Sequence, residues 1–261
     1  MAAGVGLGVA AIALAVAVSS PGSPGPTGDV LGEQGLPGAA STPPEAGLDD
    51  GPRAMAATTI VETSAAAPVW QDVLGAWRGQ ALFAVRNEGA QPLEISLADS
   101  RFTVRDGDTD VAAGRFEAAL PPVLEPGETG YLVGRFILPS APSGPLSPAS
   151  RLDAVPAAGR LVTLAVDDVR VAEDGGTVSA TGKVRNASDD RAVDGAVGVV
   201  LLAADGQPLA ALVDAASTAV LEEGEVAEFH ATYPPAPSPE DGSVARTVAI
   251  GWAWDRRVAS P

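Results

Sequence analysis

The chain carries an internal repeat. The tripeptide Val-Arg-Asn occurs at 85–87 and again at 184–186, and an Asp-Gly pair follows each copy, at 106–107 and at 205–206. Both landmarks are therefore offset by 99 residues, without a gap between them. A unit of this length, in which turn residues separate short apolar runs, is typical of a β-sandwich domain and not of a solenoid repeat. The repeat predicts two related β modules.

A third landmark and the apolar pattern agree with this prediction. Leu-Glu-Pro-Gly-Glu at 124–128 is matched by Leu-Glu-Glu-Gly-Glu at 221–225, with an offset of 97 residues. Within the first copy, Leu93, Ile95 and Leu97 alternate with other residues and fall on one face of an extended segment. This period of two is that of a strand, whereas a helix would show a period of 3.6.

The modules are predicted at residues 56–140 and 160–258, joined by a Pro-rich linker at 141–159. Prolines recur every third residue from Pro139 to Pro148. This spacing favours a stiff polyproline segment and disfavours a continuous strand, because proline lacks the amide hydrogen that a sheet uses. We expect such a linker to hold the two modules apart.

Composition limits the classes of partner and of chemistry. The chain has 33 acidic and 16 basic residues, a formal charge of −17, and this surface repels nucleic acids and anionic lipid headgroups. No nucleic-acid partner is expected. The absence of cysteine excludes disulfide bonds and thiolate catalysis.

The N-terminal segment resembles a targeting or anchoring sequence. Residues 2–18 are Ala, Gly, Val, Leu and Ile without a charge, and as a helix they would extend about 25 Å, close to the thickness of a bilayer core of about 30 Å. We expect residues 1–18 to be a signal or a membrane anchor, and residues 19–55, rich in Pro, Gly, Ser and Thr, to be a disordered tether. The alternative is an Ala/Gly-rich cytoplasmic tail.

Short strings in the two modules carry a family resemblance. In the first module they are Val85-Arg86-Asn87, Phe102-Thr103-Val104 before Asp106-Gly107-Asp108, Leu124-Glu125-Pro126-Gly127-Glu128 and Gly134-Arg135-Phe136. In the second they are Gly182-Lys183-Val184-Arg185-Asn186, Asp205-Gly206 and Leu221-Glu222-Glu223-Gly224-Glu225 before Phe229. The first module resembles the telokin-like, immunoglobulin-related domain of exported bacterial proteins of unknown function, and the second is similar to the FxLYD type of bacterial envelope module.

The resemblance covers about residues 56 to 258, although the Phe-x-Leu-Tyr-Asp string that names the second family is absent. It implies an all-β fold of two tandem immunoglobulin-like β-sandwiches, placed after an N-terminal apolar helix and a disordered Pro/Gly-rich tether. It brings no catalytic residues, because the matching strings are turns and strand ends.

One loop offers a candidate metal site. Asp106, Asp108, Asp110 and Glu117 stand at relative positions 1, 3, 5 and 12, which are the acidic positions of a helix-loop-helix calcium loop. Position 6 of such a loop requires glycine, but here it is Val111, and the second copy lacks the extra acids. The feature shared by both copies is a hairpin turn, so calcium is the less favoured interpretation.

Other candidates also have ordinary structural interpretations. His230 is the only histidine and lies in a predicted strand, and no nucleophile is singled out as its partner. The acidic pairs at 167–168, 189–190 and 222–223 fall at strand ends and turns, where solvated acids are common. Asn186-Ala187-Ser188 fits the glycosylation pattern, but Asn87 in the first copy does not, which favours a role in turn geometry.

Three functions from different classes follow. We favour a non-enzymatic extracytoplasmic envelope protein, anchored or secreted, that binds another exported or membrane protein and touches the membrane through residues 2–18 if they are retained. The alternative is a cation-binding or small-ligand-binding module that uses the loop from Asp106 to Glu117. A hydrolase built on acidic pairs is the least favoured, since no cofactor, nucleophile or phosphate loop is indicated.

Overall fold

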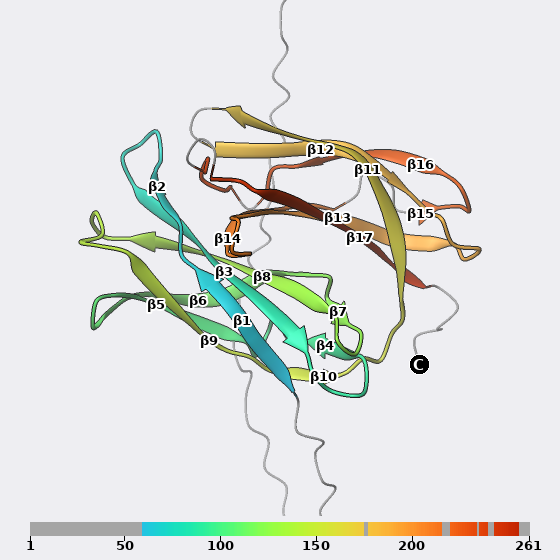
Figure 1. The fold of residues 1–261 in the computed structure, drawn as a ribbon, viewed down its shortest axis with the longest axis horizontal. Coiled ribbons are helices and arrows are strands. Elements are labelled where there is room, and N and C mark those ends of the chain that lie inside the picture. Colours follow the sequence, from blue (N-terminus) through green and yellow to red (C-terminus); the bar gives the residue numbers. More distant parts are fainter. Residues whose placement is uncertain (1–58, 175–176, 216–219, 234, 240–242, 256–261) are drawn as a thin grey trace, which may run out of the picture. The chain divides into compact units, whose positions relative to one another are not determined.

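The computed structural model describes most of the chain after residue 58. The described residues are 59–174, 177–215, 220–233, 235–239 and 243–255. All their regular elements are β-strands in antiparallel sheets, and no helix occurs in this part of the chain (Figure 1). The expected N-terminal helix and tether, residues 1–18 and 19–55, lie outside the described residues.

The first half, residues 59–156, contains ten strands. They are β1 (Ile60–Ala66), β2 (Val69–Gln71), β3 (Trp77–Asn87), β4 (Leu93–Ile95), β5 (Arg101–Asp106), β6 (Thr109–Leu120), β7 (Val123–Leu124), β8 (Thr129–Leu138), β9 (Leu146–Arg151) and β10 (Ala154–Pro156). One sheet has the order β1-β3-β8-β6-β5-β9, with β2 also paired to β3, and a small sheet has the order β10-β4-β7. The apolar core of this half includes Phe83, Phe102 and Phe116.

The described residues of the second half, between 161 and 255, form seven strands. They are β11 (Leu161–Asp174), β12 (Thr177–Arg185), β13 (Ala192–Leu202), β14 (Pro208–Ala215), β15 (Val220–Leu221), β16 (Val226–Ala231) and β17 (Arg246–Asp255). Their order is β14-β13-β17-β11-β12-β16, with β15 paired to β13. A separate core around Leu164, Val199 and Phe229 fills this half.

Five strand pairs of the first half have counterparts in the second, whereas the β6–β8 pair of the first half and the β11–β17 pair of the second have none among the described residues. The counterparts of β1–β3 and β3–β8 are β11–β12 and β12–β16. The counterpart of β4–β7 is β13–β15, that of β5–β6 is β13–β14, and that of β5–β9 is β13–β17. In the second half β13 runs without a break through the positions of β4 and β5, and β17 through those of β9 and β10. The sequence repeat is therefore a repeat of strand pairing.

The repeated asparagines are buried at equivalent places, with no exposed surface. The Asn87 amide nitrogen donates to the carbonyls of Gln91 at 2.8 Å and Leu124 at 2.9 Å. Its side-chain oxygen accepts the amide of Gly89 at 2.8 Å. Asn186 repeats this pattern with three partners of its own: Asp190 O at 2.6 Å, Leu221 O at 3.0 Å and Ser188 N at 3.1 Å.

These contacts explain why Val-Arg-Asn and the later Gly-Glu recur together. The amides of Gly127 and Gly224 donate to the backbone carbonyls of Asn87 and Asn186, and both glycines have positive φ, at 80° and 74°. Glycine adopts this conformation without strain. The expectation that Asn186 serves turn geometry is confirmed, because the amide nitrogen that a glycan would need is buried and hydrogen-bonded.

The structure corrects the expected linker at 141–159. This segment forms β9, paired with β5, and β10, paired with β4, so the first half ends after Pro156 and not at residue 140. Pro148 and Pro156 are tolerated because β9 and β10 are edge strands of their sheets, where one side of the backbone needs no partner. The break between β9 and β10 falls at Leu152 and Asp153, where the chain has no proline.

The expectation that the halves are held apart is also wrong, because they share a third apolar cluster. Its buried members are Leu82, Ala84, Leu120, Tyr131 and Val133 from the first half and Val200, Leu202, Ala211 and Trp252 from the second. Strand β3 is consequently buried on both faces from Gly79 to Val85. Leu120 lies so close to Gly198 of β13 that a Cβ atom there would stand 3.0 Å from both Leu120 methyl carbons.

Candidate functional site

The sheet face that forms the inter-half interface is only partly covered. Cross-strand pairs between β3 and β8 run along it in rows: Ala84 with Tyr131, Leu82 with Val133, Gln80 with Arg135 and Arg78 with Ile137. The first two rows belong to the shared cluster, and Gln80 is fully buried. The last row is open, since Ile137 is 60% exposed. The face of β3 and β8 that packs against the second half therefore continues beyond the contact between the halves.

A groove of about 630 Å³ occupies this uncovered end. Its lining includes Trp70, Val73, Arg78, Arg135, Ile137 and Pro235. Trp70 pairs with Arg78 across β2 and β3, which extends the floor by one more strand. Pro235 comes from the second half, so both halves contribute to the groove. Its size falls in the range of ligand and peptide sites, and its lining combines apolar surface with a few placed charges.

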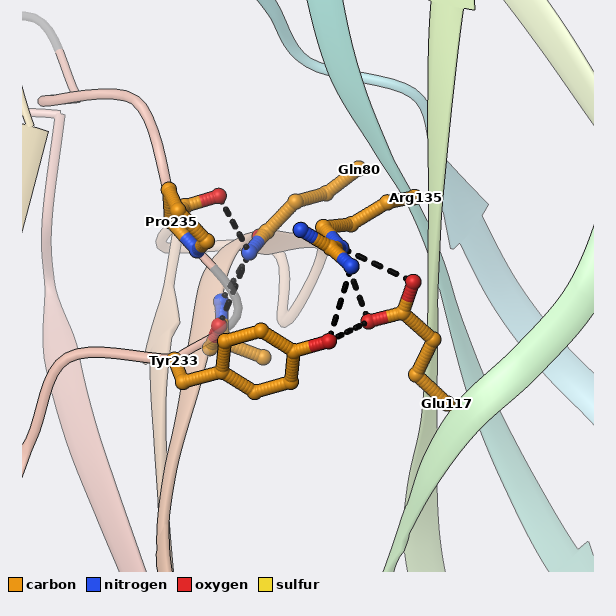
Figure 2. A network of polar contacts seen from close by, with 6 residues as sticks. Gln80, Glu117, Arg135, Tyr233 and Pro235 are labelled. Atoms are coloured by element: carbon orange, nitrogen blue, oxygen red, sulfur yellow. Dashed lines mark hydrogen bonds and ion pairs between the residues drawn. The ribbon is translucent and has the colours of Figure 1, made fainter. Parts of the chain in front are cut away.

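A polar network closes one side of the groove. The Arg135 guanidinium donates to the Glu117 carboxylate at 2.8 Å and to the Tyr233 hydroxyl at 2.8 Å. The Tyr233 hydroxyl donates to Glu117 Oε2 at 2.7 Å, so the three groups form a ring of contacts across the two halves (Figure 2). The hydrogen bond to Glu117 raises the pKa of Tyr233 above its ordinary value, and partial burial adds to this effect.

Gln80 fixes the floor of the interface next to this network. Its side-chain nitrogen donates to Ala211 O at 3.0 Å and to Pro235 O at 3.1 Å, and its side-chain oxygen accepts the amide of Ala211 at 3.1 Å. Figure 2 shows the Gln80 side chain reaching the Pro235 carbonyl beside Arg135. Because Ala211 lies in the edge strand β14, the glutamine amide takes the place of a neighbouring strand.

The β2–β3 hairpin forms the other side of the groove and exposes two large apolar side chains. Val73 is 95% exposed and Leu74 is 87% exposed. The loop that carries them is ordered by Asp72, whose Oδ1 accepts the amides of Leu74 and Ala76 at 2.9 Å each. Its Oδ2 accepts Arg78 Nε at 2.5 Å, and this hydrogen bond lowers the pKa of Asp72. The apolar tip, Val73 and Leu74, is thus presented on a structured turn.

This tip was not among the site residues predicted from the sequence. Its signal is the string Asp72-Val73-Leu74-Gly75, in which an aspartate and a glycine with a φ of 83° bracket two large apolar residues. Asp and Gly mark a turn, where polar and small residues dominate and two adjacent large apolar residues are uncommon. This combination could have been recognised from the sequence as an exposed apolar turn.

The four residues of the candidate calcium loop are not brought together. Asp106 accepts the amide and the hydroxyl of Ser143 at 2.6 and 2.7 Å, and these hydrogen bonds lower its pKa. Asp110 is paired with Arg105 at 2.7 Å. Glu117 belongs to the network at the groove, and Asp108 lies exposed in the β5–β6 turn. Among the described residues, no group of three acidic or histidine side chains is placed to hold a metal ion.

His230 lines a second hollow, of about 640 Å³, on the outer face of β12 and β16. The hollow also contains Lys183, which is paired with Asp168 at 3.0 Å. Asp168 has a φ of 56° and lies at a bulge of β11, which turns its carboxylate toward this face. Asp214 Oδ2 accepts the backbone amide of His230 at 2.6 Å. This carboxylate therefore caps the edge of β16.

The acidic pairs are likewise used locally. Asp168 of the first pair is bonded to Lys183, and Glu222 of the last pair is bonded to Arg191 at 2.9 Å. The middle pair lies at the turn that Asn186 closes, where the Asp190 carbonyl accepts the asparagine amide. Asp168 and Glu222 have the partners of solvated strand ends and turns, as the sequence favoured, whereas one carboxylate oxygen of Asp190 is buried.

No family model and no curated protein matches the chain. Within the part of the chain that the structure describes, no helix is long and apolar enough to cross a membrane.

Proposed function

We propose that the chain is a non-enzymatic extracytoplasmic envelope protein that binds another exported or membrane protein through the apolar tip and the groove beside it. In this proposal its two halves are tandem immunoglobulin-like β-sandwiches, and residues 1–18 target the chain to the membrane or anchor it there. The apolar N-terminal stretch and the matching strand pairs of the two halves support these assignments.

The observation that carries the proposal is the exposure of Val73 and Leu74 on a structured hairpin. Leaving two large apolar side chains almost fully in water forgoes about 1.5 to 3 kcal/mol each that burial would contribute. The turn hydrogen bonds of Asp72 hold the backbone of the loop in place, so the tip is presented before a partner arrives. Preorganisation of this kind reduces the entropy lost on binding.

The groove supports binding more than chemistry. Its two arginines are each engaged by a carboxylate, Arg78 by Asp72 and Arg135 by Glu117. A guanidinium remains charged at all relevant pH values and does not transfer protons. Apolar lining with neutralised charges suits recognition of a protein segment.

Site-specific photocrosslinking in the native host tests this function. A photoreactive residue in place of Leu74 is expected to give a discrete crosslinked species that mass spectrometry identifies. The same residue in place of Val226, which is 52% exposed on β16, is the matched control and should not yield that species. An identical pattern from both positions, or no species from Leu74, contradicts the proposal.

A further inference from the structure

We propose that the partner contributes a cationic segment, in which apolar side chains flanked by Lys or Arg fill the groove and cover Val73 and Leu74. This inference rests on the proposed function and names the chemistry of the partner at the same site. It follows from the exposure of the tip, the continuity of the groove with the inter-half interface, and the charge of the chain.

The tip requires an occupant larger than a small molecule. Val73 lines the groove, but Leu74, the next residue, is 87% exposed and is not part of the lining. A ligand enclosed in the groove would leave Leu74 in water. A chain segment that crosses the groove and continues over the hairpin covers both side chains.

The groove continues an interface that already packs closely. Along β8 the same face carries Tyr131 and Val133, which the second half buries, then Arg135, and then the exposed Ile137. On the same face of the neighbouring strand β3, Arg78 is the cross-strand partner of Ile137 in the open row. An occupant of the groove therefore extends a contact surface whose other end is filled by the second half.

Charge decides between possible occupants. Arg78 and Arg135 are neutralised locally by Asp72 and Glu117, so the remaining field comes from the whole chain, with its formal charge of −17. Such a field accelerates the approach of cationic groups and repels a second copy of the chain and anionic bilayers. A protein segment with Lys or Arg beside its apolar residues matches both the apolar surface and the field.

Three labelled synthetic peptides test the proposal on the full chain by fluorescence anisotropy. In the first, leucine alternates with arginine; in the second, leucine alternates with glutamate; in the third, serine replaces the leucine of the first. The first is expected to bind most tightly. The third reports binding that depends on charge alone, and the second reports apolar contact when the peptide charge is reversed.

Two variants locate the binding. The combined substitution Val73→Ser and Leu74→Ser is expected to weaken binding of the leucine–arginine peptide at least about tenfold, since two buried apolar contacts are lost. Ile137→Ser, at the floor, should weaken it by a smaller factor. Val226→Ser is the control on the second half and should change the dissociation constant less than about twofold. All these side chains are exposed, and unchanged urea denaturation curves verify that each variant is folded.

Several results would overturn the inference. If the leucine–arginine peptide binds the tip variant and the unsubstituted chain with the same affinity, the binding site is not at the tip. If the leucine–glutamate peptide binds as tightly as the leucine–arginine peptide, the partner need not be cationic. Loss of binding to phosphatidylcholine vesicles in the tip variant, with peptide binding unchanged, assigns the surface to a membrane. A concentration-dependent dimer that the tip variant abolishes assigns it to a second copy.

Crosslinking from position 74 tests the proposed function independently of the peptides. If the peptides fail but crosslinking from position 74 still captures one identified protein, the site stands and only the cationic chemistry falls. If crosslinking fails as well, both fall.

Discussion

The side chain of Gln80 exchanges two hydrogen bonds with the backbone of Ala211, 131 residues later in the chain. Both residues are buried, and the glutamine also donates to Pro235. An edge strand normally exposes unpaired backbone groups that attract other strands. Here the Gln80 side chain of the first half forms hydrogen bonds with the backbone of Ala211 in an edge strand of the second half. These hydrogen bonds join the two β modules into one unit.

Replacing Gln80 by Met tests this junction. Methionine has a similar size but no hydrogen-bonding amide, so the amide and the carbonyl of Ala211 lose their partners inside the interface. The free energy of unfolding is expected to fall by about 2 to 4 kcal/mol, as measured by urea denaturation. Gln207→Ala is the control, because Gln207 contacts Ala65 O across the same boundary at 3.3 Å but is exposed; it should cost less than about 0.5 kcal/mol. Similar losses in the two variants would contradict the assigned role.

The repeated asparagines should be equally important in the two halves. Asn87→Ala and Asn186→Ala each remove a buried amide that serves two carbonyls and one backbone amide, and each is expected to destabilise the chain by about 2 to 4 kcal/mol. Asn→Asp substitutions at both sites should also be destabilising, because a carboxylate accepts but cannot donate. Denaturation curves measure the effects, with Glu88→Ala as an exposed neighbouring control. A decrease in the free energy of unfolding at only one of the two sites would show that the two asparagines do not contribute equally to stability.

The strands and turns could be predicted from the sequence because their determinants are local. Alternation of apolar residues and the Asp-Gly turns identified the hairpins, and Gly107 and Gly206 have the positive φ, 59° and 86°, that such turns use. The Pro-rich segment was wrongly predicted to be a linker, because proline is disfavoured in central strands but tolerated in edge strands. Whether a strand lies at an edge depends on its neighbours, which the spacing of Pro148 does not reveal.

The interface and the groove depend on contacts between distant residues. The continuous apolar run from Val197 to Leu202 carried a signal of burial on both faces, and the structure places Val200 and Leu202 in the shared cluster. Nothing local marks Gln80 as the partner of Ala211. The spacing of the candidate calcium loop did not reveal that Asp106 and Glu117 have different partners, Ser143 and Tyr233.

The close approach of Gly198 to Leu120 should appear as a coupling energy. Gly198→Ala places a methyl group against the leucine and is expected to cost about 1 to 2 kcal/mol of stability. In a Leu120→Ala background the same change should be neutral or stabilising, because the methyl then enters vacated space. A double-mutant cycle by urea denaturation measures the difference. Gly144→Ala, where an added Cβ meets nothing within 4 Å, is the control. Additive effects of Gly198→Ala and Leu120→Ala would contradict the contact.

Calcium should leave the chain unchanged. Asp106, Asp110 and Glu117 are occupied by Ser143, Arg105 and Arg135, and binding a cation would require breaking these contacts. We expect the same Tm by differential scanning fluorimetry in millimolar calcium and in chelator. A rise in Tm that disappears when Asp108 and Asp110 are replaced by Asn would restore the loop as a cation site.

The two tyrosines of the chain both lie at the boundary between the halves and should titrate late. Burial raises the pKa of Tyr131, and the hydrogen bond to Glu117 raises that of Tyr233, both from an ordinary value of 10.0. Below that pH the hydroxyls are protonated in the folded and the unfolded chain, so their contribution to stability is complete. Above it the unfolded chain releases protons first, and the free energy of unfolding should fall as the pH rises. Tyrosinate absorbance should appear at higher pH in the folded chain than in urea, and the variants Tyr131→Phe and Tyr233→Phe assign each step. Coincident titrations in the two states would show that neither hydroxyl is held by the interface.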